Sequence, residues 1–360
     1  MAEAFAPLPL AGVRVVDFST LLPGPLATLM LVEAGAEVIK IERPGGEDAR
    51  RMPPFVDGRS AFFGALNARK SVRVLDMRVA ADVEAARELV RSADVVVEQF
   101  RPGVMDRLGL GYDVARALNP KIIYCAITGY GQTGPNALKA GHDLGYQAEA
   151  GMLGVLAEPG LPAPLVADIG GGALPAVINI LLALRQRELT GEGAFLDIGM
   201  APFARAFVPH LIADQASDAP SPAGGFLLTG GSPRYQIYRA ADGRAIAVAA
   251  LEEKFWRAFC GVLGLDPATL DDAGDPEGVR ALVAGRLATR TAAEWEPLFV
   301  AADCCVELVQ PPEALTPGEE TVWVADAGGR RVPVAPVPIV PALRHPRPAG
   351  DLPWPELPEA

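Results

Sequence analysis

The chain has 360 residues, of which half are apolar and 21% are charged, and its formal net charge is −12. This balance supplies material for a large hydrophobic core and excludes disorder over the whole chain. The acidic surplus argues against a general nucleic-acid binder, because such proteins need basic surfaces. A chain of this length suggests about two domains.

The four cysteines and three histidines show no spacing typical of a metal site. Cys304 and Cys305 are adjacent, and we expect reduced thiols rather than a disulfide framework. The first ten residues, MAEAFAPLPL, lack the basic start and apolar core of a signal peptide. The longest apolar stretch, near Ala173–Leu184, is interrupted by Pro175 and Asn179. We therefore predict a soluble, cytoplasmic protein that binds no metal and spans no membrane.

The first part of the chain alternates strand patterns with helix patterns. Such alternation predicts an α/β fold with a parallel sheet covered on both faces. No G-x-G-x-x-G follows the first strand, so we predict no NAD or FAD site. The expected strands are Val13–Phe18, Glu37–Ile41, Ser71–Leu75, Asp94–Val97 and Lys121–Ile127, and the expected helices are Leu26–Glu33, Val83–Arg91 and Val114–Leu118.

The second part of the chain changes character. A long apolar helix is expected over Gly172–Glu188, followed by a Pro- and Gly-rich stretch up to Ser232. An Asp-Gly turn at 241–244 predicts a hairpin over Tyr235–Ala250. Helices follow at 253–262, 278–287 and 292–302, which indicates a smaller α+β domain. The Pro-rich tail, Val332–Pro358, is expected to run extended.

Three residues are candidates for acid–base chemistry. His142 lies in a glycine-rich loop beside Asp143, so it is either a catalytic imidazole or a capping or core residue. Asp168 precedes three glycines and the long helix, so it is either a helix N-cap or a reactive carboxylate beside free backbone N–H groups. Glu252 stands where a helix begins, and its simplest role is that of a first-turn acid.

Basic residues that follow predicted strands are candidates for an anionic ligand. Arg43 follows the second strand, and Arg101 and Arg107 follow the fourth. In an open α/β sheet, ligands bind outside the carboxyl ends of the strands. Each arginine alone is commonly a solvated surface charge, but their equivalent positions favour a phosphate-binding edge.

Seven stretches together resemble the class III CoA-transferase superfamily of the CaiB/BaiF type. The resemblance implies an acyl-CoA thioester ligand, an interlaced homodimer and a Rossmann-like large domain. It divides the chain into 1–200 (large CoA-binding domain), 201–232 (linker), 233–315 (small domain) and 316–360 (a return to the large domain). The stretches are Leu10–Asp17, Leu22–Pro25, Gly35–Pro44, Ala93–Glu98, Phe100–Gly103, Arg107–Gly111 and Gly129–Pro135.

The resemblance assigns contacts with CoA to several positions and requires no separate cofactor, since CoA is part of the substrate. The positions implied are Arg43, Leu75, Gln99, Phe100, Arg101, Arg107, Gly141 and Tyr146.

Two branches of the superfamily are compatible with these residues. In the transferases, an Asp at the position of Asp168 attacks the thioester. In the 2-methylacyl-CoA racemases, that Asp and a His at the position of His142 exchange the α-proton, and a Glu at the position of Glu252 pairs with the His. The resemblance therefore predicts a racemase that works through an enolate. Asp143 is expected to raise the basicity of the imidazole. Burial is expected to raise the basicity of the Asp168 carboxylate.

An acyl-CoA:carboxylate CoA-transferase is the alternative prediction, and a non-catalytic acyl-CoA-binding protein is a third. The segment 46–67 is more similar to the transferases. Glu253 stands where racemases commonly have Pro, and Arg234 where an aromatic residue is common.

Overall fold

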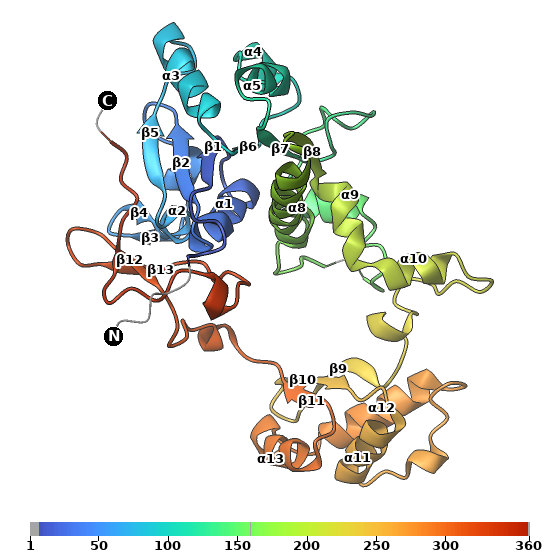
Figure 1. Cartoon of the computed structure of the whole chain (residues 1–360). Helices are drawn as coiled ribbons and strands as arrows, with labels where there is room; N and C mark the ends of the chain where they lie inside the picture. Colours follow the sequence, from blue (N-terminus) through green and yellow to red (C-terminus); the bar gives the residue numbers. More distant parts are fainter. Residues whose placement is uncertain (1–6, 159, 359–360) are drawn as a thin grey trace. The chain divides into compact units, whose positions relative to one another are not determined.

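The computed structural model describes residues 7–158 and 160–358, and the chain divides into two compact units. The larger unit comprises Met1–Ala150, Pro162–Phe207 and Pro317–Ala360, and the smaller comprises Gly151–Leu161 and Val208–Thr316. Within the larger unit, the early strands (blue) and the late strands (red) fold together (Figure 1). The start of the N-terminal segment examined for a signal peptide lies outside the described residues.

A six-stranded parallel sheet forms the centre of the larger unit, in the order β5-β2-β1-β6-β7-β8. This confirms the predicted α/β class, although β8 was not predicted. From β1 the chain adds β2 and β5 toward one edge of the sheet, and then β6, β7 and β8 toward the opposite edge. The topological switch point therefore lies between β1 and β6. The strands are β1 (Arg14–Asp17), β2 (Glu37–Glu42), β5 (Ser71–Val74), β6 (Val95–Glu98), β7 (Ile123–Thr128) and β8 (Ala194–Gly199).

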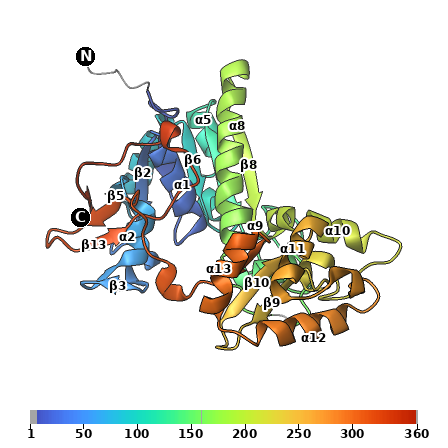
Figure 2. The same ribbon diagram turned by 90° about the horizontal axis from the view of Figure 1, so that it is seen from below.

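Helices cover both faces of this sheet. On one face, Ala86 and Val90 of α3 (Ala80–Arg91) and Ala115 of α5 (Tyr112–Leu118) pack with Val16 and Val96 of the sheet. On the other face lie α1 (Pro23–Glu33), which is buried at every residue, and α8 (Leu174–Thr190), which runs beside β8 in Figure 2. The larger unit also contains α2 (Ala61–Asn67), α4 (Val104–Arg107), α6 (Asp143–Glu149), α7 (Val166–Asp168), α9 (Met200–Ala204) and the short strands β3 (Phe55–Val56) and β4 (Arg59–Ser60).

The predicted long helix begins earlier than expected. α7 and α8 are joined by a π-turn, Ile169–Ala173, into one helical segment from Val166 to Thr190. A Cβ atom on Gly171 would lie 2.1 Å from the carbonyl oxygen of Met200, so glycine is needed for α9 to approach so closely. By length and composition this segment would suit a membrane span, and one face of it packs on α1 and on β7 and β8.

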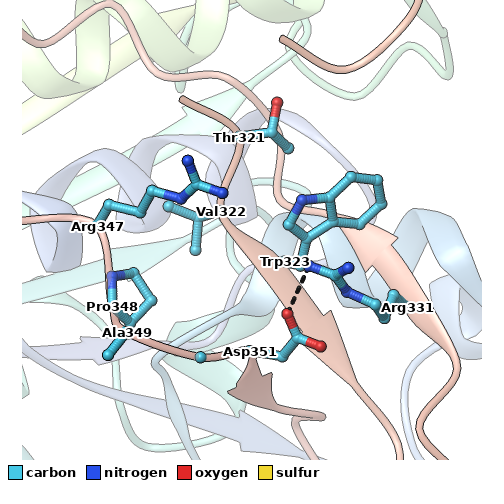
Figure 3. A pocket seen from close by; sticks show the side chains of 9 residues that line it. Thr321, Val322, Trp323, Arg331, Arg347, Pro348, Ala349 and Asp351 are labelled. Carbon is cyan, nitrogen blue, oxygen red and sulfur yellow. Dashed lines mark ion pairs between the residues drawn. The ribbon is translucent and has the colours of Figure 1, made fainter. Parts of the chain in front are cut away.

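The C-terminal segment completes the larger unit. It forms β12 (Trp323–Ala325), β13 (Arg331–Pro333) and β14 (Leu352–Pro353), and its other described residues are irregular apart from turns and one 3-10 helix, Pro341–Leu343. Trp354 is buried against Gly64 of α2. A polar pocket of about 180 Å³ lies between β12, β13 and the chain before β14 (Figure 3). None of the predicted site residues lines it.

The smaller unit pairs an antiparallel sheet, ordered β11-β10-β9, with three helices. Its core is aromatic and includes Trp256, Phe259, Trp295 and Phe299. The elements are β9 (Tyr235–Arg239), β10 (Ala245–Ala249), β11 (Val306–Leu308), α10 (Pro209–Gln215), α11 (Glu253–Leu263), α12 (Pro276–Leu287) and α13 (Ala292–Ala302). Within 201–232, the predicted linker, the structure forms α10 and most of α9.

Candidate active site

Most residues predicted to contact CoA lie in loops that leave one edge of the parallel sheet. The carboxyl ends of parallel strands meet at the same edge, so these loops are neighbours. They carry Arg43 after β2, Leu75 after β5, and Gln99, Phe100 and Arg101 after β6. Arg107 ends α4, a few residues further along the chain.

The arginines at this edge differ in what they already bind. Arg43 is exposed and pairs with the Asp48 carboxylate, with 2.6 Å between their atoms. Arg101 and Arg107 are exposed too, but neither forms an ion pair with another of the described residues. Two guanidinium groups without a protein counter-ion suit an anionic ligand such as a phosphate.

His142 lies in a turn that a hydrogen bond from Tyr146 holds in place. The side chain is exposed and immediately precedes α6. The Tyr146 hydroxyl donates a hydrogen bond of 2.7 Å to the carbonyl oxygen of Gly141. A Cβ atom on Gly141 would lie 2.5 Å from the Tyr146 ring, so only glycine permits this approach. Gly141 and Tyr146 therefore fix the backbone from which the imidazole projects.

Asp143 is the buried link between α6 and α7. One of its carboxylate oxygens accepts hydrogen bonds from the backbone N–H groups of Ala167 (2.8 Å) and Asp168 (2.9 Å). The other accepts from the Gln147 amide at 2.6 Å. The Asp143 carboxylate is therefore committed to the start of the helix that carries Asp168, and its effect on the basicity of the His142 imidazole stays a prediction.

Asp168 is the third residue of α7 and is half-buried, so it is not the N-cap considered above. Burial, and then the negative charge of Asp143, raise its pKa to about 7. The pKa of Tyr146 rises to about 12 through burial and then the charge of Asp168, with Arg101 acting in the opposite direction. Asp168, Tyr146 and Arg101 therefore belong to one electrostatic site, and a carboxyl group of this kind can give or take a proton near neutral pH.

Glu252 lies in the smaller unit, exposed and immediately before α11. Its pairing with His142 stays a prediction. The two nearby departures from the racemase pattern are partners of each other: Arg234 pairs with Glu253 at 3.1 Å and also with Asp272. The guanidinium of Arg234 lies 5.0 Å from the centre of the Trp256 ring. Arg234 and Glu253 thus neutralise each other's charge at the surface of the smaller unit.

Sequence reasoning missed two features of the site. It did not identify the hydrogen bonds of Asp143. Of these, only the bond from the Gln147 side chain has a sequence signal, the i, i+4 spacing of a helical pair. It also overlooked Lys40, a charged residue within a buried parallel strand, which signals buried counter-ions. Within residues 7–158 and 160–358, no three His, Cys, Asp or Glu side chains are grouped to hold a metal ion.

Comparison with known proteins agrees with this architecture. The model of CoA-transferase family III matches residues 10–348. The human alpha-methylacyl-CoA racemase is 34% identical over 82% of this chain and 76% of its own length. The succinate–glutarate CoA-transferase of Agrobacterium fabrum is 39% identical over 73% of this chain and 68% of its own. The crystal structure of a CaiB/BaiF family protein from Brucella suis superposes with a TM-score of 0.80, at 27% identity, covering 95% of this chain and 96% of that one. The chain belongs to CoA-transferase family III.

Proposed function

We propose that this protein is a racemase of 2-methylacyl-CoA thioesters that exchanges the α-proton between His142 and Asp168. The observation that carries the proposal is the state of Asp168: a half-buried carboxyl group whose pKa is about 7. Asp143 joins the start of its helix to the helix that begins beside His142. A base and an acid held by one buried link suit proton transfer at a single carbon atom.

The proposed reaction passes through an enolate. In one direction the neutral imidazole of His142 removes the α-proton, and protonated Asp168 delivers a proton to the opposite face. The reverse direction exchanges these roles. The Asp168 carboxyl group must therefore exist in both protonation states at the working pH, which a pKa of about 7 allows. Backbone N–H groups at the start of α6 would stabilise the enolate oxygen.

Arg101 and Arg107 are proposed to bind the phosphates of CoA, supported by their exposure at the carboxyl edge of the sheet. CoA enters as part of the substrate, and the proposed reaction needs no resident cofactor. A cytoplasmic location remains a prediction.

A second copy of the chain is proposed as the partner. α8 carries large apolar side chains that are exposed in the single chain, including Leu182 at 63% and Leu189 at 71%. Several exposed large apolar side chains on one helix are typical of protein interfaces. Sedimentation of a dimer that dissociates when Leu182 is replaced by Glu would support the proposal, and a wild-type monomer would contradict it.

CoA transfer is the second candidate. It is supported by transferases among the relatives and by the Asp168 carboxylate, which accepts no hydrogen bond from another of the described residues. The carboxylate would attack the thioester carbonyl, expel CoA thiolate and form a mixed anhydride. The thiolate would then attack the aspartyl carbonyl to give an aspartyl-CoA thioester and release the first carboxylic acid.

Incubation of (2S)-2-methylacyl-CoA in D2O separates the two candidates. The racemase predicts α-deuterium in the recovered thioester, and His142→Ala abolishes racemisation while His210→Ala, the matched control in α10, does not. A transferase instead predicts a CoA–protein adduct by mass spectrometry and activity that survives His142→Ala. Binding of CoA without either reaction would indicate a binding protein.

A further inference from the structure

Four buried charged side chains meet around the last residue of β1. Asp17 ends β1, Lys40 is paired beside it in β2, Glu47 follows β2, and Lys70 precedes β5. We call Asp17, Lys40, Glu47 and Lys70 the β1 charge cluster. The Lys40 ammonium group lies 2.8 Å from the Glu47 carboxylate, and the Lys70 ammonium group lies 3.4 Å from the Asp17 carboxylate. The exposed fractions of all four side chains are 3% or less. Two cations and two anions balance within the cluster, and none of the four belongs to the proposed acid–base machinery.

The cluster holds the loop that follows β1. The Lys40 ammonium group donates to the carbonyl oxygen of Ser19 at 2.9 Å, and a Glu47 oxygen accepts from the backbone N–H of Leu21 at 2.8 Å. Leu21 has a φ of 63°, in the left-handed region that a leucine rarely adopts. Backbone strain of this kind persists only where surrounding groups impose it, and it occurs mostly at functional sites.

The same loop meets a predicted ligand residue. Gly24, in the first turn of α1, donates its backbone N–H to the Gln99 side-chain oxygen at 3.0 Å, so the start of α1 contacts the loop after β6 at the switch point of the sheet. A Cβ atom on Gly24 would lie 2.1 Å from the Cβ of Ser19, which shows how tightly the loop folds back. Leu21 immediately precedes the turn of α1 whose Gly24 presents its N–H to Gln99.

We propose that Lys40 and Glu47 are positioning residues for the CoA-thioester site. Glu47 accepts the Leu21 N–H and Lys40 donates to the Ser19 carbonyl oxygen, and together they hold residues 19–24 in the strained form that places Gln99 for the ligand. The proposal rests on the proposed function for the identity of the ligand. Its structural part, that Glu47 holds the Leu21 backbone, stands independently.

A purely stabilising role for the pair makes a different prediction. A buried ion pair can often be replaced by apolar residues of similar size with little loss of stability. K40M/E47L removes both charges and the acceptor for Leu21, whereas K40M/E47Q removes both charges but keeps a side-chain oxygen at position 47. The Glu33–Arg69 pair, also in the larger unit, has a buried carboxylate and a partly exposed guanidinium group, and it supplies the control R69M/E33L.

The experiment measures binding of free coenzyme A by calorimetry, together with hydrogen exchange over residues 19–24. K40M/E47L is expected to bind at least about tenfold more weakly, while K40M/E47Q and R69M/E33L stay within about threefold of the wild type. Exchange at the Leu21 amide should quicken in K40M/E47L alone. In the wild type this amide should be protected to the same degree as the amides of β1.

Equal affinities for K40M/E47L and K40M/E47Q would overturn the proposal, as would equal weakening in R69M/E33L. If K40M/E47L does not fold, the wild-type exchange decides: rapid exchange at Leu21 overturns the proposal and protection supports it. A wild-type protein that binds no coenzyme A would defeat the proposed function, while the exchange pattern would still report on the loop.

Discussion

Two regions of the larger unit bury carboxyl groups whose pKa values shift in opposite directions. In the β1 charge cluster, burial alone would raise the pKa of Asp17, but Lys40, Lys70 and two hydroxyl hydrogen bonds outweigh burial and hold it below its usual range. At Asp168, burial is joined by the like charge of Asp143, and the pKa rises to about 7. The difference between a structural anion and a proton-exchanging acid is therefore whether a cation is buried beside it.

Burial also acts on the two lysines of the cluster, and it opposes their charged form. Burial lowers the pKa of Lys70 to about 7, with Lys40 acting in the same direction and Asp17 against it. Lys40 is buried as well, yet Asp17 and Glu47 outweigh burial and hold its pKa above the usual value. The Asp143–Asp168 pair has no comparable cation, although Arg101 acts on the neighbouring Tyr146.

The largest effect is expected from Asp168→Asn, which removes the proton-exchanging group. Its racemisation rate should fall by about a thousandfold, within the range typical of general acid–base catalysis. Chiral chromatography of the product thioester measures the rate, and circular dichroism checks that the variant is folded. A variant that keeps a tenth of the wild-type rate would exclude Asp168 as a base.

Asp17→Asn should reduce the free energy of unfolding by about 3–5 kcal/mol, because it leaves buried lysines without a full counter-charge. Urea denaturation measures the change. Asp48→Asn, which breaks an exposed pair with Arg43, is the control and should change the stability little. Equal effects of the two substitutions would show that burial of the cluster is not what makes it sensitive.

Asp168 should make the protein less stable as the pH rises. A carboxyl group whose folded-state pKa is above its unfolded value favours folding while it is protonated. The stability that protonated Asp168 contributes is lost as the pH rises from about 4, the ordinary pKa of an aspartate, to about 7, its pKa in the folded protein. The full shift of about three pKa units corresponds to about 4 kcal/mol, which solvent screening of the half-buried group reduces. At pH 8 the free energy of unfolding of Asp168→Asn should therefore exceed that of the wild type by on the order of 2 kcal/mol, and at pH 4 the two should agree. A constant difference from pH 4 to pH 8 would contradict the raised pKa.

The smallest effect is expected at Glu253, a carboxyl group that has cations beside it but is exposed to solvent. Hydrogen bonds from Arg257 and Arg234 hold its pKa below the usual value, yet solvent screens the pair. Glu253→Ala should leave the urea midpoint unchanged. A large loss of stability there would show that exposure matters less than pairing.

Much of the sheet could be predicted from sequence, because β-branched runs such as Asp94–Val97 report burial directly. β8 was missed because its sequence, AFLDIG, has exposed alternate positions and a single β-branched residue. The start of α7 was missed because three glycines follow Asp168, and glycines predict a loop unless close packing by another helix requires them. Packing of that kind leaves no local pattern in the sequence.

For the site, residues after strands could be placed from sequence, because the carboxyl edge follows from the strand order. The backbone partners of Asp143 could not be predicted from the sequence. They are the N–H groups of Ala167 and Asp168, and because almost every residue has such a group, it leaves no sequence signal. The pairing of Arg234 with Glu253 also depended on the fold, because the strand β9 and the helix α11 must meet for the two departures to compensate.

Stereochemically resolved deuterium exchange tests the central claim most directly. Each enantiomer of a 2-methylacyl-CoA is incubated in D2O with His142→Ala and with Asp168→Asn. Two bases on opposite faces predict that each variant still exchanges the α-proton of one enantiomer, that the two variants retain opposite enantiomers, and that neither completes racemisation. Loss of exchange from both enantiomers in both variants, or full activity of His142→Ala, would contradict the account.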